Sequence, residues 1–446
     1  MNRSGSNDLV IQNNTWSGAS NNVDYNESFT YDANGNILTL TRYGTSAQQQ
    51  SMDDLTYNYY SGTNRLEYVG DIVDPDNYTT DIDDQNSGNY TYDEIGNLKS
   101  DAQEGISAID WTVYGKIKSI TKTGTGDHLE FKYDAQGNRI AKIAKPSTTL
   151  GTPSTWTTTY YLRDAQGNVL ATYEDKPNDA GFHIMENALY GSSRLGIMRR
   201  EIDLLNLPSG GEGHYSGTRG KKAFELSNHL GNVLTVVSDQ KKGIDDTGSD
   251  GIADYYTANV RSATDYYAFG APMPGRSYNS SSYRYGFNGK ENDREVIGTG
   301  QGTQDYGMRI YNPSLGRFLS VDPITRQYPE LTPYQFASNR PIDGIDLDGL
   351  EYFNSSTILT AGASIAFGNG YGMNIAIQKG TAYDMIGKTH FTAYSLVHPG
   401  NQKLDDGSDN PQLNIGGEAS LLESSLAIIH EPIFANAVNK LGFSFS

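Results

Sequence analysis

The chain has 446 residues, with 34 Lys and Arg against 53 Asp and Glu, and therefore a formal net charge of −19 at pH 7. A charge of this size repels nucleic-acid backbones and anionic membrane surfaces, which argues against either as the main partner. The sequence contains no cysteine, and this excludes disulfides, thiolate metal sites and cysteine nucleophiles.

Tyrosine and glycine are abundant, at 32 and 49 residues, whereas apolar residues make up only 36%. Tyrosine suits a sheet with one wet face, and glycine supplies the positive φ angles of tight turns. The composition therefore predicts an all-β chain of many short strands. No apolar run is long enough to span a bilayer. The stretch 1–24 is expected to be irregular, and its first residues lack the apolar segment of a secretion signal.

A short motif recurs from residue 31 onward. It reads YDANGNI at 31–37, YDEIGNL at 92–98, YDAQGNR at 133–139 and RDAQGNV at 163–169, with a degenerate copy, SNHLGNV, at 227–233. Asp or Asn can accept backbone hydrogen bonds at the start of a type I turn, and the Gly takes the left-handed conformation that closes a bulged hairpin. Each copy therefore predicts one β-hairpin, and residues 57–66 predict another.

The acidic turn residues also raise the question of calcium binding. One carboxylate per turn is too few for a site of six to eight oxygens, so turn capping is the preferred interpretation. A denser cluster contains Asp245, Asp246, Asp250 and Asp254. It leaves calcium open as an alternative to a solvated loop.

The Tyr-Asp-x-x-Gly-Asn motifs resemble the YD repeats of the RHS (rearrangement hotspot) family, over about residues 25–350. The resemblance implies β-hairpins that wind into a spiral sheet and close as a hollow shell, here over 25–264. Residues 265–350 are similar to the RHS repeat-associated core. The matching segments include DYYAFG at 265–270, YGFNGKE at 285–291, YGMRIYNP at 306–313 and LGRF at 315–318.

In several members of the family this core cuts its own chain after a Gly-Leu pair by an aspartyl-protease-like reaction. The resemblance assigns the catalytic roles to Asp322, Asp346 and Arg309, and the scissile bond to Leu350–Glu351. Two carboxyl groups held close together share a proton, so one can activate water while the other polarises the carbonyl. An arginine can hold one carboxylate in its ionised form.

One departure from the family pattern keeps a second interpretation open. The second Asp of the family is usually followed by Pro, whereas this chain has Leu347 after Asp346. Asp343 and Asp348 are nearby carboxylates that could take the same role. The alternative is that Asp343, Asp346 and Asp348 cap turns and that no bond is cut.

The composition changes after Leu350. Residues 351–446 contain no Arg, four Lys and eight Asp and Glu. Residues 364–377 predict strand, turn and strand, and 420–439 carry apolar residues at mixed helical spacing, so a small β-rich or α+β domain is expected. The resemblance implies that 351–446 is a variable payload, commonly a toxin. Its candidate general bases or metal ligands are His390, His398, His430 and Asp384, whose spacing matches no metal motif; no cofactor is implied.

The whole sequence thus predicts the C-terminal part of an RHS-type polymorphic toxin, located outside the cell or at its surface. The implied partners are the payload inside the shell, an immunity protein and a secretion machinery, and the shell itself is not expected to bind nucleic acid. The alternative is an extracellular or wall-associated repeat protein that adheres to surfaces or binds carbohydrate and carries no toxin.

Overall fold

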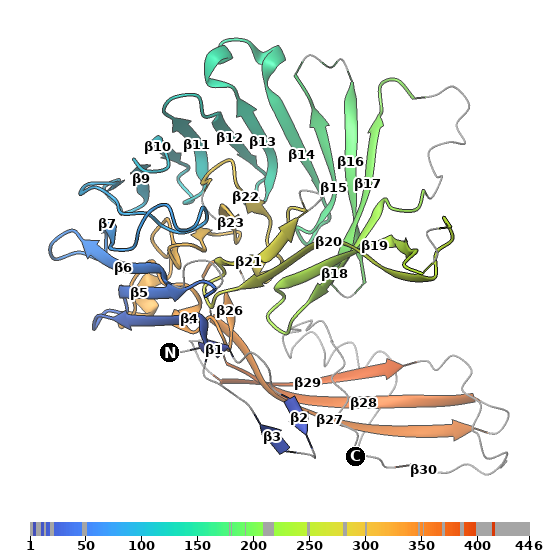
Figure 1. Cartoon of the computed structure of the whole chain (residues 1–446). Helices are drawn as coiled ribbons and strands as arrows, with labels where there is room; N and C mark the ends of the chain where they lie inside the picture. Colours follow the sequence, from blue (N-terminus) through green and yellow to red (C-terminus); the bar gives the residue numbers. More distant parts are fainter. Residues whose placement is uncertain are drawn as a thin grey trace. The chain divides into compact units, whose positions relative to one another are not determined.

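The computed structural model describes residues 23–46, 51–177, 179, 181–191, 193–207, 218–247, 250–279, 283–298, 301–346 and 348–350, and further strand backbones within 3–22 and 352–414. The chain divides into two compact units, Met1–Tyr352 and Phe353–Ser446. The regular structure of the described residues consists of β-strands and short 3-10 turns, which confirms the predicted all-β fold (Figure 1). In this part of the chain, none of the helices could span a membrane.

The first unit contains two antiparallel sheets in which strands pair with their neighbours in sequence. The smaller sheet has the order β1-β4-β5-β6-β7 and the larger runs from β8 to β21. The smaller one consists of β1 (Arg3–Gly5), β4 (Asn22–Tyr31), β5 (Ile37–Tyr43), β6 (Ser51–Tyr59) and β7 (Leu66–Asp71). A separate hairpin, β2 (Val10–Gln12) with β3 (Thr15–Ser17), lies in the stretch expected to be irregular.

The larger sheet is a meander of 14 strands. They are β8 (Tyr90–Tyr92), β9 (Leu98–Asp101), β10 (Ile106–Trp111), β11 (Ile117–Lys122), β12 (His128–Tyr133), β13 (Arg139–Lys145), β14 (Thr157–Arg163), β15 (Val169–Asp175), β16 (Phe182–Tyr190), β17 (Arg194–Asp203), β18 (Lys222–Ser227), β19 (Val233–Ile244), β20 (Tyr255–Tyr266) and β21 (Pro272–Asn279). Figure 1 shows this sheet strongly curved.

The repeated motif forms the predicted hairpin turns. In the first copy, Asp32 Oδ1 accepts hydrogen bonds from the N–H groups of Asn34 and Asn36, each at 2.8 Å. Gly35 has a φ of 77°, which L side chains rarely adopt, and its N–H donates to the Asp32 carbonyl. Asp93, Asp134, Asp164 and Asn228 cap their turns in the same way. The prediction of five capped hairpin turns is confirmed.

In several hairpins, a side chain at the end of a strand bonds to an earlier hairpin. Tyr133 is the last residue of β12, and its hydroxyl donates to the carbonyl of Ile117, the first residue of β11, at 2.8 Å. In the fourth motif Arg163 replaces the tyrosine, and its Nε donates to the carbonyl of Arg139 at 2.8 Å. Where this bond forms, the position holds a long side chain with a terminal donor. The same bond joins Tyr59 to Ile37, Trp111 to Leu98, Tyr190 to Val169 and Tyr266 to Val233.

The end of the first unit covers one face of both sheets. It contains β22 (Asn292–Asp293), β23 (Thr303–Asp305), β24 (Ile310–Asn312) and β25 (Arg317–Phe318), which form a small sheet of their own. Figure 1 shows β22 and β23 on the concave side of the larger sheet. The main hydrophobic core joins apolar residues of both sheets, from Ile37 to Phe131, to Val296, Ile297, Ile310, Leu315 and Leu319.

A buried ion-pair network fixes this covering segment, residues 283–346, on the larger sheet. Arg139 of β13 lies 2.5 Å from Asp293, and Lys142 of the same strand lies 3.2 Å from the other oxygen of Asp293. Arg284 pairs with Glu291 at 2.6 Å. Removing one member of such a network leaves an uncompensated buried charge, so the network specifies one register for the segment.

The first and last hairpins of the repeat region contact each other. The hydroxyl of Tyr25 in β4 donates to the carbonyl of Pro274 in β21 at 3.1 Å. The hydroxyl of Tyr267, just after β20, donates to the carbonyl of Tyr43 at 2.5 Å. Side chains therefore connect the two ends of the repeat region across more than 200 residues of sequence.

In the second unit, β27 (Tyr352–Phe367), β28 (Tyr371–Tyr383) and β29 (Lys388–Val397) form an antiparallel meander, and β30 (Leu413–Asn414) pairs with β27. Phe367 pairs with Tyr371 in the register of β27 and β28, which confirms the two strands predicted within 364–377. The turn predicted between them lies outside the described residues. The helical pattern of 420–439 lies outside the described residues.

Tyr266→Phe is expected to lower the stability of the first unit by about 1 kcal/mol, the net contribution of one hydrogen bond. The substitution keeps the buried ring and removes only the hydroxyl that bonds to Val233. The midpoint of urea unfolding, followed by tyrosine fluorescence, measures the change. Tyr278→Phe is the matched control because that side chain is 55% exposed. Equal midpoints for the two variants would contradict a stabilising role for the bond.

Candidate functional site

The structure brings together the three side chains that the resemblance assigns to cleavage. Arg309 directly precedes β24, Asp322 follows β25, and Asp346 ends β26 (Ile345–Asp346). The Nη2 atom of Arg309 lies 3.2 Å from Asp322 Oδ2 and 3.6 Å from Asp346 Oδ2. All three side chains are 2% exposed or less. One guanidinium nitrogen therefore contacts both carboxylates in a site closed to solvent.

The two carboxylates use their oxygens in the same way. Asp322 Oδ1 accepts the N–H of Ile324 at 2.9 Å, and Asp346 Oδ1 accepts the N–H of Gly349 at 2.6 Å. In each residue the remaining oxygen, Oδ2, faces Arg309. Each of the two carboxylates therefore caps a turn with one oxygen and directs the other toward the arginine.

Arg309 is held from several sides. Its Nε donates to the carbonyl of Gly349, its Nη1 to the carbonyl of Pro333 at 3.3 Å, and its guanidinium lies 3.8 Å from the ring centroid of Phe318. Gly349 has a φ of 89°, and a Cβ at this position would lie 2.8 Å from the backbone nitrogen of Arg309. A residue other than glycine would therefore push the chain at 349 away from Arg309. Leu350 follows directly and is half-buried, and Glu351 lies outside the described residues.

Burial governs the electrostatics of the site. It raises the pKa of Asp346 to about 6, although Arg309 and the Gly349 N–H act in the opposite direction. Burial likewise raises the pKa of Asp322, again opposed by Arg309, and lowers the pKa of the Arg309 guanidinium. The Nη2 atom of Arg309 and Oδ2 of Asp346 are buried without a well-aligned hydrogen bond to any described residue. These two atoms therefore keep hydrogen-bonding capacity that no described residue uses.

The neighbouring aspartates occupy different surroundings. Asp343 is exposed and pairs with Arg340. The side chain of Asp348 is also exposed, while its backbone carbonyl accepts the N–H of Met308 at 2.7 Å. Of the three aspartates near Gly349, Asp346 is the one that lies buried against Arg309. Leu347, the residue that departs from the family pattern, lies outside the described residues.

The sequence interpretation did not include Lys290. Its ammonium lies 4.6 Å from the ring centroid of Tyr306, and burial lowers its pKa, opposed by the charges of Asp305, Asp346 and Asp348. Lys290 thus adds a second cation close to the carboxylates. Its position in the GKE run at 289–291, within the resemblance to the core, was the available signal.

Among the described side chains, the other candidate residues form no site. Asp254 accepts hydrogen bonds from the N–H groups of Asp246 and Thr247, so it caps its loop. Among the described side chains, no three carboxylates or imidazoles are grouped as metal ligands would be. The backbone of His390 lies in β29 opposite Thr381. Asp384, His398 and His430 lie outside the described residues.

Sequence comparison finds relatives of several kinds. The chain is 27% identical over 267 residues to salivary gland surface protein 1 of Aedes aegypti, which covers 58% of this chain and 6% of the relative. It is 24% identical over 338 residues to toxin subunit YenC1 of Yersinia entomophaga, and the match covers 74% of this chain and 29% of the relative. It is 25% identical over 278 residues to the tRNA3(Ser)-specific nuclease WapA of Bacillus spizizenii, and the match covers 61% of this chain and 9% of the relative. Two of these relatives are named as a toxin subunit or a nuclease.

The chain spans less than a third of each of these relatives. No protein-family model matches it. Among solved structures it is similar to TcdB2-TccC3, with 13% identity, a TM-score of 0.38 and coverage of 73% of this chain and 19% of that one.

Asp346→Asn is expected to change how stability depends on pH. An ionised Asp346 destabilises the folded chain above its raised pKa of about 6, and this penalty is relieved as the pH falls toward the unfolded value of 3.8. The melting temperature of the wild type minus that of the variant should therefore rise from about pH 7.5 to about pH 4.5.

Asp343→Asn is the control, since its carboxylate is exposed. The melting temperature of the wild type minus that of Asp343→Asn should not rise in this way as the pH falls. Chain masses are checked before melting, so that intact and cut samples are not compared. A pH-independent difference for Asp346→Asn would show that this carboxyl titrates normally in the folded chain.

Proposed function

We propose that the chain is part of an RHS-type toxin in which residues 25–350 form the shell and core and the segment after Leu350 is the payload. The YD-type turns, the one-sided covering of the sheets and the similarity to toxin subunits support this proposal. The payload is released when the core cuts the Leu350–Glu351 bond. The payload, an immunity protein and a secretion machinery are the partners, and the protein acts outside the cell that makes it.

The observation that carries the proposal is the placement of Arg309. Its guanidinium contacts both buried carboxylates and also binds the carbonyl of Gly349, one residue before the predicted scissile bond. Because Arg309 contacts the two carboxylates and the Gly349 carbonyl at once, it holds the acid–base pair in a fixed position relative to the backbone next to the scissile bond. Such positioning supplies much of the rate of a reaction that each chain performs once.

The two carboxyl groups take complementary roles. Asp322, which lies closer to Arg309, is ionised and accepts a proton from water as the water oxygen attacks the Leu350 carbonyl carbon. Asp346, whose pKa is raised to about 6, is the partner that is protonated below that pH and then donates a hydrogen bond to the carbonyl oxygen. The carbon–nitrogen bond then breaks, and the amine of Glu351 takes up the proton. The products are a carboxylate at Leu350 and a new amino terminus at Glu351.

A second function is favoured by one observation. Several tyrosines of the sheet are largely exposed, with Tyr255, Tyr256 and Tyr278 at 47%, 62% and 55%. Aromatic rings of this kind can pack on sugars or on other surfaces while the hydroxyl remains hydrated. An adhesive or carbohydrate-binding repeat protein without cleavage would use such exposed rings, and a relative from Aedes aegypti is named as a surface protein.

The intact mass of the purified chain tests the two functions. Cleavage is expected to give a fragment of about 10.5 kDa beginning at Glu351, because residues 351–446 are 96 of the 446 residues of the 48.8 kDa chain. Asp322→Asn and Asp346→Asn should each leave one uncut chain, since each removes one partner of the acid–base pair.

Asp343→Asn and Asp348→Asn are the matched controls, because both carboxylates are exposed. Both controls should be cut as the wild type is. A single uncut mass for the wild type would refute self-cleavage and favour the adhesive function. Cutting of Asp346→Asn at the wild-type rate would show that this residue is not the acid.

A further inference from the structure

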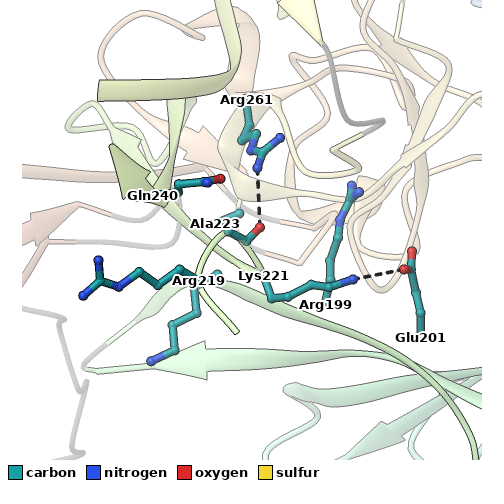
Figure 2. A pocket seen from close by; sticks show the side chains of 9 residues that line it. Arg199, Glu201, Arg219, Lys221, Ala223, Gln240 and Arg261 are labelled. Atoms are coloured by element: carbon teal, nitrogen blue, oxygen red, sulfur yellow. Dashed lines mark hydrogen bonds and ion pairs between the residues drawn. The ribbon is translucent and has the colours of Figure 1, made fainter. Parts of the chain in front are cut away.

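A cavity of about 300 Å³ lies among β17, β18, β19 and β20, away from Arg309 and its carboxylates. It is lined by five cationic side chains and one carboxylate (Figure 2). The cations are Arg199, Arg219, Lys221, Lys222 and Arg261, and the carboxylate is Glu201. In a chain with a net charge of −19, this concentration of positive charge is a local exception.

The cavity opens on the face of the sheet that carries the core. Ile197 faces Ala223 across β17 and β18, and both are buried with Tyr283 and Tyr285 of the covering segment. Arg199 lies two residues beyond Ile197 on β17, and alternate residues of a strand share a face. The cavity therefore begins where the apolar covering of this face ends.

The positive charge is only partly compensated within the cavity. Lys221 pairs with Glu201 at 3.3 Å, and both side chains are about half exposed. The rest of the lining holds four cations and no further carboxylate, so the lining as a whole carries a net positive charge. This charge would attract an anion into the cavity. The field of the cluster is local, because salt screens charges beyond roughly 8 Å at physiological ionic strength.

Polar groups at the cavity are held in place by the turn before β18. Arg261 Nη2 donates to the carbonyl of Gly220 at 3.5 Å, and the Gly220 N–H donates to Asp239 at 2.6 Å. Gly220 has a φ of 90°, and a Cβ there would lie 2.9 Å from the side-chain oxygen of Gln240. Figure 2 shows Arg199, Arg261 and Gln240 around one opening, with Lys221 turned toward Glu201. Two guanidinium groups and an amide thus approach the same space from different strands.

We propose that this cavity binds a small, doubly charged oxyanion, namely a phosphate or sulfate group, either free or carried by a small organic molecule. Guanidinium groups match the oxygens of such an anion in pairs, and an amide adds a neutral donor. The size of the cavity suits a small ligand. The net charge of the chain opposes long polyanions, which extend beyond the range of the local field.

Isothermal titration of the full chain with inorganic phosphate at constant ionic strength tests the site. Wild type is expected to bind with a dissociation constant of about 1 mM or lower. Arg199→Gln with Arg261→Gln should weaken binding at least about tenfold, as expected for the loss of charge-assisted bonds. Arg219→Gln with Lys221→Gln removes more exposed side chains and should weaken it in the same direction, which guards against a folding defect in the first pair.

Two further variants sharpen the result. Lys99→Gln with Lys118→Gln removes the same charge from exposed positions elsewhere and should leave binding unchanged. Glu201→Gln removes the lining carboxylate and should tighten binding. No binding up to about 10 mM phosphate, or an equal loss in the Lys99 and Lys118 control, would overturn the proposal.

Competition separates the sources of the anion. Glucose 6-phosphate that binds at least about tenfold more tightly than inorganic phosphate indicates a phosphorylated organic ligand. Equal affinity indicates the free anion, and either result supports the site. Tighter binding of a hexaglutamate peptide than of either phosphate would overturn the proposal in favour of an acidic protein partner.

Discussion

Burial of one face of a long antiparallel sheet is the constraint on which the rest of this structure depends. Each hairpin has alternate apolar residues that face the same way, and no single hairpin can cover its own face. Residues 283–346 supply that cover for strands that come from most of the repeat region. The buried network of Arg139, Lys142 and Asp293 gives the cover one register on the sheet. The site around Arg309 lies in this covering segment, so its geometry depends on the repeats being folded.

The site shows how turn formation and chemistry are combined in one residue. Each carboxylate bonds one oxygen to a backbone N–H and directs the other to Arg309. The turn therefore orients the carboxylate without occupying the oxygen that faces the guanidinium. The contacts of Arg309 to the carbonyls of Gly349 and Pro333 then join three chain segments that are distant in sequence.

Much of the fold could be predicted from the sequence because the signals are local. The Asp-x-x-Gly-Asn turn closes within five residues, so the motif predicts the capping bonds of Asp32 and its equivalents. The role of the residue before this Asp, usually Tyr, could not be predicted, because the carbonyl that accepts its hydrogen bond belongs to an earlier hairpin. Arg163 can replace the tyrosine because its Nε donates the equivalent bond. Arg139 and Asp293 are 154 residues apart in the sequence, and no local pattern identifies one as the ion-pair partner of the other. Arg309, Asp322 and Asp346 came from resemblance to a family, whereas Lys290 and the basic cavity required three-dimensional contacts.

The position of the covering segment in the chain has a consequence for biosynthesis. Strand residues up to Phe131 wait for Val296 to Leu319 before their apolar face is covered. At about 5–20 residues per second, this delay on the ribosome is roughly ten to sixty seconds. The nascent sheet therefore needs protection from aggregation, by a chaperone or by the translation rate itself. Folding is also ordered from one end to the other, because residues after Leu350 leave the ribosome only once the segment that completes the sheet has been made.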